Sequence, residues 1–336
     1  MLRQGAGLRG EARAPRVQVL ADGAVVPGLI GAEVHSNNHL AADRFRCTLA
    51  VKAGGLGAVD APGVRIEVQI GTGGGWTSLV VGEVDSVSLD PLRGVVNFEG
   101  RDLAALLIDT RVDETFANRT SSEIAGVLAG RHGLEISATS THTLVGRYYR
   151  SEHDRSAMGQ FSRAMSEWDL LAFLAGREGF DLFMDGAVLR FEAREEGEAF
   201  SVGTSDCLSL RMEHSLGLER AIEVTVRSWD QRGAQAVVQM ARGGGRGRVW
   251  KHSVVRPNLP PDEAQRMAER VLADLVRHVR TVSLEMPGET ALTARATVAL
   301  SGTGTDWDRS YAVSEVSRFL DVQRGFVQSI SLQGLV

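Results

Sequence analysis

The 336-residue chain is poor in cysteine and proline and has no long hydrophobic run, and each shortage excludes a class of protein. Its two cysteines, Cys47 and Cys207, lie far apart and show neither disulfide nor metal-ligand spacing, so we expect small buried apolar side chains. No apolar segment is long enough to span a bilayer, and none follows the arginines of residues 1–15 as a secretory signal requires. We therefore expect synthesis in the cytoplasm and no stable membrane insertion.

The sequence also lacks a recognisable catalytic, cofactor-binding or metal-binding motif. Glu152-His153-Asp154 groups acid and base side chains, but neighbours on a strand point in different directions and no second ligand pair follows. The acidic pairs Asp113-Glu114 and Glu195-Glu196 do not define a hydrolase site, because that chemistry depends on their separation across a cleft. A net charge of −5 argues against a protein that coats nucleic acid. We expect no enzyme, no cofactor and no metal.

What the chain has in abundance is glycine, with 38 residues, and part of it forms a pattern that occurs twice. Each copy reads as a strand, a Gly-Thr-Gly turn, a tryptophan, a second strand, an Arg-Gly turn and a third strand. The matched order predicts two copies of one β unit, whereas the alternative is two unrelated meanders that share glycine turns and valine strands. The repeated residues are Gly71, Gly73, Trp76, Glu83 and Gly94 in the first copy and Gly302, Gly304, Trp307, Glu315 and Gly325 in the second.

The hydrophobic pattern divides the chain into four parts. Short alternating segments without intervening helices are typical of a barrel or sandwich, and they occupy both ends of the chain. We expect a mainly β protein with an α+β insert, in which two similar tube-type β-barrel domains flank a mixed α/β middle domain. The expected boundaries are a flexible basic arm at 1–15, a first β domain at 16–106, the middle domain at 107–200, and a second β domain at 201–336 with a helical insert at about 260–280.

Local signals place the helices of the middle domain. Thr120 followed by Glu123 has the spacing of a capping box, which predicts a helix that Gly133 ends. Ser166, with Asp169 three residues on, predicts a second helix that stops at Gly179. The Asp185-Gly186 turn then predicts a hairpin.

Two further groups of residues carry specific expectations. Trp76 and Trp307 begin equivalent strands, and we expect both to plug their barrels rather than to stack on a ligand. Arg242, Arg246 and Arg248 lie in a glycine-rich basic run, which suits a loop that faces a partner or passing DNA; the alternative is a mobile loop without a partner.

Several stretches resemble a known family, the baseplate hub proteins of tailed phages, of the late control protein D and Mu-like hub type. The chain is also similar to the N-terminal hub part of type VI secretion spike proteins. It departs from the family where Thr293-Ala294-Arg295 replaces a frequent Pro-Gly, and where Phe319 stands near a frequent histidine. The resemblance rests on Gly100 to Leu107, Phe116 to Ala125, His132-Gly133-Leu134 and Val298 to Leu332.

The resemblance implies a structural hub without turnover. Three chains would form a pseudo-sixfold ring that joins a hexameric tail tube to a trimeric spike and lets DNA pass. The implied partners are two further copies of the chain, a tail tube or distal tail protein, a separate spike protein, a tape-measure protein and baseplate wedge proteins. The implied location is the tail baseplate of the virion, after assembly in the host cytoplasm.

Three other functions stay open at the level of sequence. The chain could be the hub of a type VI-like secretion system or another contractile injection system. It could hydrolyse cell wall, which would require a pocket with paired carboxylates. It could bind cell wall through exposed aromatic residues, for which Tyr148-Tyr149 and Trp168 are the candidates, although Trp168 reads as a helix-packing residue.

Overall fold

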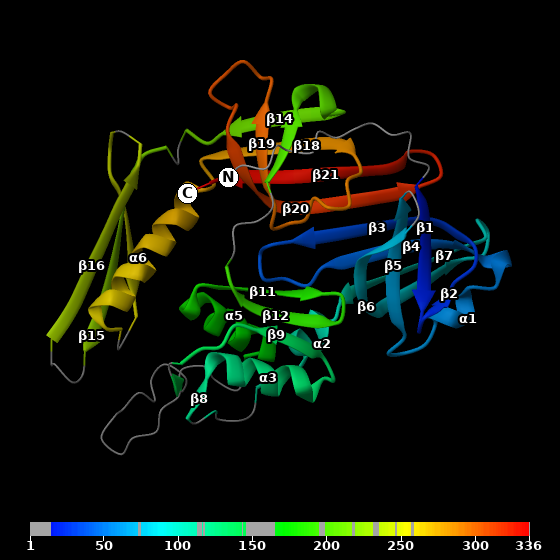
Figure 1. The fold of residues 1–336 in the computed structure, drawn as a ribbon, viewed down its shortest axis with the longest axis horizontal. Helices are drawn as coiled ribbons and strands as arrows, with labels where there is room; N and C mark the ends of the chain where they lie inside the picture. Colours follow the sequence, from blue (N-terminus) through cyan, green and yellow to red (C-terminus); the bar gives the residue numbers. More distant parts are fainter. Residues whose placement is uncertain are drawn as a thin grey trace.

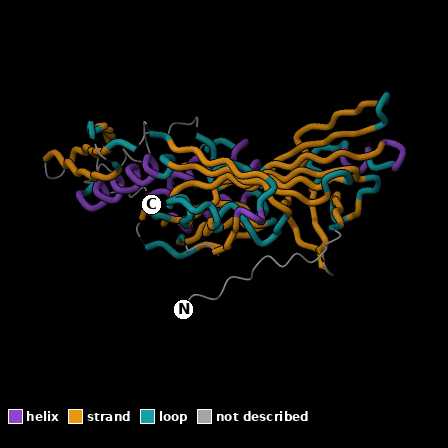
Figure 2. The backbone as a smooth tube through the Cα atoms, turned by 90° about the horizontal axis from the view of Figure 1, so that it is seen from above, coloured by secondary structure: helices purple, strands orange, loops and turns teal. Residues whose placement is uncertain are grey.

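The protein is mainly β, as the sequence predicts, with 53% strand and 19% helix. Figure 1 shows the computed structural model, in which one 13-stranded sheet, mostly antiparallel, runs through the molecule. Seen from above, its strands pass through the centre as a continuous layer (Figure 2). The structure describes residues 15–72, 75–112, 116, 118–142, 144–145, 165–194, 199–216, 219–230, 235–245, 247–256 and 259–335.

A first group of strands forms one end of the large sheet, in the spatial order β2-β1-β5-β6-β7-β4-β3. Apolar and polar residues alternate along these strands, as in β4, where Phe45, Cys47 and Leu49 are buried between exposed or half-buried neighbours. The elements are β1 (Arg16–Ala21), β2 (Ala24–Val25), β3 (Leu29–Asn37), β4 (Arg44–Ala50), η1 (Val51–Ala53), α1 (Leu56–Val59), β5 (Arg65–Thr72), β6 (Gly75–Asp90) and β7 (Val95–Asp102).

A second group forms the other end and has its own apolar core around Tyr311, Val298 and Leu284. Its spatial order is β13-β19-β20-β21-β18-β14. The elements are β13 (Ala199–Gly203), η2 (Thr204–Asp206), β14 (Ser209–His214), β18 (Arg280–Pro287), β19 (Thr297–Ser301), β20 (Ser310–Asp321) and β21 (Gly325–Gly334).

The expectation of two closed barrels is wrong for the part of the chain that the structure describes, where no barrel closes. The physical reason lies in β20, which pairs with β19 along its first residues and with β3 along its last residues. On this side β20 exchanges β19 of its own group for β3 of the other, while it stays paired with β21 on its other side. The two groups therefore share one sheet instead of each closing on itself.

The middle of the chain packs three helices against a small sheet around one apolar core. Both predicted caps are confirmed: Thr120 and Glu123 form a capping box at the start of α3, and Ser166 and Asp169 form one at the start of α5. The predicted hairpin is confirmed as β11 and β12. The elements are α2 (Ala104–Asp109), β8 (Arg119–Thr120), α3 (Ser121–Arg131), β9 (Glu135–Ala138), β10 (Leu144–Val145), α5 (Glu167–Glu178), β11 (Phe180–Asp185) and β12 (Val188–Ala193).

An insert between β14 and β18 stands beside the main body, at the left of Figure 1. Its helix α6 was predicted near residue 260, but two of its strands were not. It consists of β15 (Ala221–Asp230), β16 (Gln235–Gly244), β17 (Trp250–Val255) and α6 (Pro261–Val276), which covers one face of this three-stranded sheet. None of the described helices is both long and apolar enough to cross a membrane.

Candidate assembly interface and domain junction

Five strands of each group lie in the same order. In the chain the first runs β3, β4, β5, β6, β7, and the second runs β14, β18, β19, β20, β21. In space the first is ordered β5-β6-β7-β4-β3, and the second β19-β20-β21-β18-β14. Position for position these orders agree. The insert therefore occupies, in the second group, the place that the short connection from β3 to β4 has in the first.

The turn before the last strand of each group is held by the same contacts. Asp90 Oδ1 accepts hydrogen bonds from the amides of Leu92 (3.0 Å) and Arg93 (2.9 Å). Asp321 Oδ1 accepts them from the amides of the residues two and three positions on, at 2.8 and 2.6 Å. Gly94 and Gly325 then adopt positive φ angles of 69° and 74°, which other residues adopt only at a cost. The Asp-x-x-Arg-Gly pattern thus builds one turn twice.

The seam between the groups is an antiparallel pairing of β20 with β3. Seven residue pairs form it, from Glu315 opposite Asn37 to Asp321 opposite Gly31. On the core side Val34 is 0% exposed and Leu320 is 3% exposed. Strands about 280 positions apart in the sequence thus form a junction whose core side is buried.

Part of β6 and the whole of β14 each have one strand edge without a ladder partner among the described residues. Like β20, β6 divides: Gly75 to Glu83 pairs with β5, whereas Val84 to Asp90 pairs only with β7 among the described residues. At the other end of the sheet, β14 pairs only with β18 within the described part of the chain. The open part of β6 corresponds in position to the part of β20 that pairs with β3, and β14 corresponds to β3.

The two tryptophans of the repeat differ in their surroundings. Trp307 is half-buried against the second core, and its ring lies 5.1 Å from the guanidinium carbon of Arg280. Trp76 is 42% exposed, and the guanidinium carbon of Arg16 lies 5.3 Å from the centre of its ring. The prediction that Trp76 is buried as a barrel plug is therefore wrong. The reason is that β5 and β6 continue as a hairpin beyond the core, with Trp76 directly opposite Gly71 near its tip.

This difference predicts unequal mutational effects. We expect Trp307→Ala to lower the free energy of unfolding by about 2 kcal/mol, because part of an apolar contact and a cation–π contact are lost. We expect Trp76→Ala to cost less than about 1 kcal/mol, because its ring is largely in solvent. Urea unfolding of the two variants measures both values, and equal losses would contradict the assigned burial.

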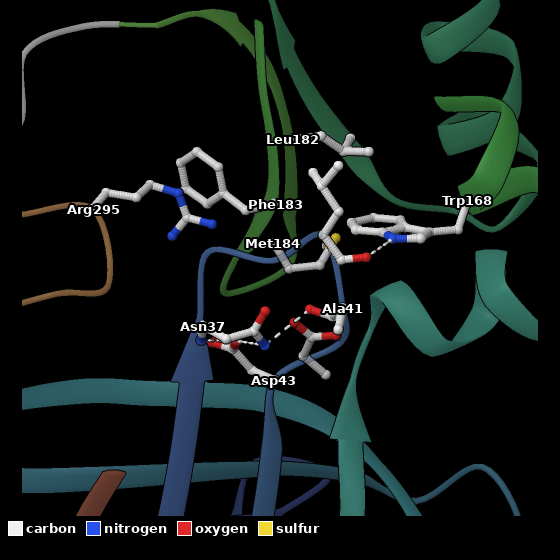
Figure 3. A pocket seen from close by; sticks show the side chains of 10 residues that line it. Asn37, Ala41, Asp43, Trp168, Leu182, Phe183, Met184 and Arg295 are labelled. Carbon is white, nitrogen blue, oxygen red and sulfur yellow. Dashed lines mark hydrogen bonds between the residues drawn. The ribbon is translucent and has the colours of Figure 1, made fainter. Parts of the chain in front are cut away.

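The junction between the two strand groups and the middle of the chain is the other candidate site (Figure 3). The connection from β3 to β4, residues 38–43, is the junction loop. Asn38 Nδ2 donates to the carbonyl oxygen of Val313 in β20 at 2.8 Å. From the other side, Trp168 Nε1 of α5 donates to the carbonyl oxygen of Leu40 at 2.6 Å. One short loop thus contacts elements of the other two parts.

Buried charged groups gather beside this loop. Burial raises the pKa of the Asp43 carboxyl, and burial together with the nearby charge of Asp43 raises the pKa of Asp102 to about 7. Burial lowers the pKa values of Arg295 and Arg318, whose charges favour the ionised form of Asp43. The guanidinium carbon of Arg295 lies 3.3 Å from the ring centre of Phe183 (Figure 3).

The geometry of the junction does not suit catalysis. Its cavity measures about 10 Å³, room for about one water molecule and for no substrate. A groove of about 220 Å³ crosses the seam near Asp321, where Glu33 and Arg46 line it together with Arg324. Within the described ranges no group of three or more His, Cys, Asp or Glu side chains could hold a metal ion.

Several other predicted positions can be placed. Cys47 is buried as expected, whereas Cys207 is only half-buried. Arg242 belongs to strand β16 rather than to a loop, and its guanidinium pairs with Glu223 of β15. Arg248 is exposed beyond the end of that strand. The predictions made for residues 1–14, Gly73, Asp113-Glu114, Tyr148-Tyr149, Glu152-His153-Asp154, Glu195-Glu196 and Arg246 lie outside the described residues.

One buried ionic cluster was not predicted from the sequence. Glu167, the first residue of α5, is fully buried and pairs with Arg131 and with His132 Nε2, the latter at 2.6 Å. His132 follows the last residue of α3, where a basic side chain favours the helix dipole whatever its partner. Because the partner is 35 residues away, no local signal marks the contact.

Comparison with solved structures finds the same architecture over nearly the whole chain. A tail protein from Neisseria meningitidis MC58 superposes with a TM-score of 0.75 at 15% identity, over 96% of this chain and 97% of that one. The chain has the fold of phage tail proteins. The 43 kDa tail protein of prophage MuSo2 from Shewanella oneidensis superposes with a TM-score of 0.70 at 16% identity, over 95% of this chain and 98% of that one.

The phage tail protein fold extends to a secretion component. The c3393 protein of E. coli, a component of the type VI secretion system described as similar in structure to the T4 tail proteins gp27 and gp5, gives a TM-score of 0.57 at 12% identity, over 94% of this chain and 76% of that one. No sequence family and no curated protein matches the chain. The resemblance seen in the sequence is confirmed at the level of fold.

Proposed function

We propose that the chain is a structural hub of a phage tail baseplate, in which three copies form a pseudo-sixfold ring between a hexameric tail tube and a trimeric spike. The observation that carries this proposal is the pair of strand groups of identical order, joined edge to edge in one sheet. Two equivalent units in each of three chains give six units around one axis. Such a ring offers sixfold contacts on one side and threefold contacts on the other, which is the symmetry match that tube and spike require.

The exposed face of the large sheet supports a channel lining. Opposite the buried side chains, the strands carry glutamates, serines and a few arginines, and the arginines Arg46 and Arg101 are held in ion pairs. A neutral or acidic lining suits DNA passage, because a lining of free arginines would retain the phosphate backbone. The glutamates of this face include Glu33, Glu67, Glu83, Glu99, Glu213, Glu285 and Glu315.

The partners follow from this role. The tail tube or distal tail protein would meet the sixfold side, a separate spike protein the threefold side, and baseplate wedge proteins the outside, with the end of the tape-measure protein in the channel. The protein would reside in the virion and act without turnover. The small junction cavity and the shared fold with tail proteins support a non-enzymatic role.

A hub in a type VI-like secretion system is the second candidate, favoured by the shared fold with the c3393 protein. The cell-wall-binding alternative loses one of its aromatic candidates, because Trp168 is 4% exposed. The sequence context of the neighbouring genes would separate phage from secretion particle.

The mass of the purified chain in solution tests the ring. We expect light scattering to give about 109 kDa, three times the 36.2 kDa of one chain, because closed threefold symmetry requires three copies. A stable dimer at every concentration would contradict the proposed ring, since two copies cannot match a threefold spike.

A further inference from the structure

The three-stranded sheet of the insert has one face covered by α6 and one uncovered face. Ile222, Val224 and Val226 of β15 point toward α6 and form a small core with it. Because side chains alternate along a strand, the residues between and beyond them lie on the other side. The uncovered face consists of Glu223, Thr225, Arg227 and Trp229 of β15, Ala236, Val238, Met240 and Arg242 of β16, and Lys251, Ser253 and Val255 of β17.

Four large apolar side chains are exposed on the uncovered face. Trp229 is 52% exposed, and Val238, Met240 and Val255 are 51%, 45% and 69% exposed. The strand registers bring them together, since Val238 and Val255 lie on either side of Arg227. A group of exposed apolar side chains of this kind marks a site of contact with a protein or a membrane.

The sheet of the insert is basic, although the chain as a whole is acidic. Residues 219–256 carry eight arginine or lysine side chains and three acidic ones, a net charge of +5, whereas the whole chain carries −5. Glu223, the acidic residue of the uncovered face, is 6% exposed and pairs with Arg242 and Lys251. Arg227 is exposed and has no ion pair within the described part of the chain. The charge that this face presents to solvent is therefore basic.

Trp229 lies at the end of the insert that is remote from the strand groups. Ala221, where the chain enters the sheet, lies opposite Gly244, and Leu272 near the end of α6 packs on Gly243. Both connections of the insert are thus at one end of the sheet. Trp229 lies eight residues along β15 from Ala221, a distance of about 26 Å at about 3.3 Å per residue. Figure 1 shows the insert beside the main body, at the left.

We propose that the uncovered face of the insert binds the surface of an anionic membrane. Anionic headgroups attract a surface whose free charges are basic, and the interface of a bilayer accepts tryptophan and aliphatic side chains. Stable protein interfaces bury about 800 Å² on each side, whereas three strands span only about 14 Å. Nucleic acid is bound by basic and aromatic side chains and gains little from exposed valine and methionine. The combination of side chains thus fits a lipid surface best.

The contact is peripheral, and it goes beyond the proposed hub role because it belongs to the single chain. Trp229 and its apolar neighbours enter the headgroup region. The strands themselves stay outside the hydrocarbon, where the edges of an open sheet would find no hydrogen-bond partners. In a ring of three chains, three such faces would strengthen one another by avidity.

Binding of the full chain to lipid vesicles tests the charge of the face. We expect the chain to float with vesicles of phosphatidylcholine and phosphatidylglycerol in equal parts, and not with vesicles of phosphatidylcholine alone. Arg227→Glu should weaken the binding about thirtyfold, because one unit of charge at an anionic surface changes affinity about fivefold. Arg93→Glu is the matched control, since the Arg93 side chain is 83% exposed in the turn before β7. It should bind as the wild type does.

Trp229 tests the apolar part of the contact. Trp229→Ala should weaken the binding at least tenfold, because the ring no longer leaves water on the membrane. The matched control is Trp76→Ala, which removes a tryptophan that is 42% exposed on a different surface and should leave the binding unchanged. Lipids brominated on their acyl chains should quench the tryptophan emission of the wild type, and they should quench that of Trp229→Phe much less.

The outcomes separate the membrane contact from its rivals and from the ring. A wild-type chain that stays free of anionic vesicles overturns the proposal, and so does binding that the variants weaken no more than their controls. Binding of a DNA oligonucleotide that Arg227→Glu abolishes, without any vesicle binding, assigns the face to nucleic acid instead. The mass in solution tests the hub separately, and a chain that binds vesicles but forms no trimer keeps the membrane contact and loses the ring.

Discussion

Replacing Trp168 with alanine should lower the free energy of unfolding by about 3–5 kcal/mol, the usual loss for truncation of a buried tryptophan. The side chain is 4% exposed and packs in the core of the middle part of the chain. Its Nε1 also donates to the carbonyl oxygen of Leu40, a residue held at a φ of +58°. Truncation therefore removes apolar contacts and leaves a strained loop without its hydrogen bond to α5.

Chemical denaturation measures this loss, and two further variants interpret it. Trp168→Phe keeps most of the ring but removes the donor, so we expect a smaller loss that includes about 1–2 kcal/mol for the hydrogen bond. Trp229→Ala removes a tryptophan that is 52% exposed on the insert, and it should change stability by less than about 1 kcal/mol. Equal losses for Trp168→Ala and Trp229→Ala would contradict the anchoring role.

The importance of Trp168 follows from what the junction loop connects. The loop is bound to β20 through Asn38 and to α5 through Leu40. In the second strand group the same place in the strand order is taken by the whole insert. The junction loop thus contacts both other parts of the chain. The corresponding connection in the second strand group is the insert, which stands beside the main body.

Local features of the fold could be predicted from the sequence, because their causes are local. The capping boxes at Thr120 and Ser166 each act within four residues, and the hairpin of β11 and β12 is set by its two-residue turn. The Asp-x-x-Arg-Gly turns carry their own hydrogen bonds. The succession of three strands and two turns along the chain was therefore visible in the sequence as a repeated pattern.

Features that depend on distant residues could not be predicted. Nothing near β20 indicates that half of it pairs with β3, because each strand alternates in a way that suits any neighbour. The glycines of β16 read as a loop, yet Gly243 pairs with Ile222 and packs below Leu272 of α6. The exposure of Trp76 depends on how far a hairpin extends beyond its core, which the pattern of glycines does not encode.

The cluster of buried charged groups at the junction could not be predicted from the sequence for the same reason. Asp43 and Asp102 lie 59 positions apart, and Arg295 comes from the other strand group. Burial of such groups is costly unless they are paired. Their pKa values therefore shift in the direction that favours the neutral form, upward for the aspartates and downward for the arginines. This cluster makes the stability of the fold depend on pH in an unusual direction.

Asp102→Asn should stabilise the protein at pH 8 and flatten its dependence on pH. Burial, with the charge of Asp43 second, raises the pKa of Asp102 from 3.8 to about 7 in the folded state. Between these two values the folded protein holds a proton that the unfolded chain has released, so stability falls as the pH rises through this window. Asparagine carries no charge and can still accept the hydrogen bond that the amide of Ala104 donates to Oδ1 at 3.0 Å.

We expect a gain on the order of 2–4 kcal/mol at pH 8 and little change at pH 4, because one unit of pKa shift corresponds to about 1.4 kcal/mol. Asp43, whose pKa is raised in the same direction, should leave a residual slope, and the charges of Arg295 and Arg318 reduce it. Asp109→Asn is the control of opposite sign: hydrogen bonding to Arg101 lowers the pKa of Asp109, so its contribution is lost as the pH falls. Denaturant unfolding of the three proteins from pH 4 to 8 measures these slopes, and parallel curves for wild type and Asp102→Asn would show that Asp102 stays ionised in the fold.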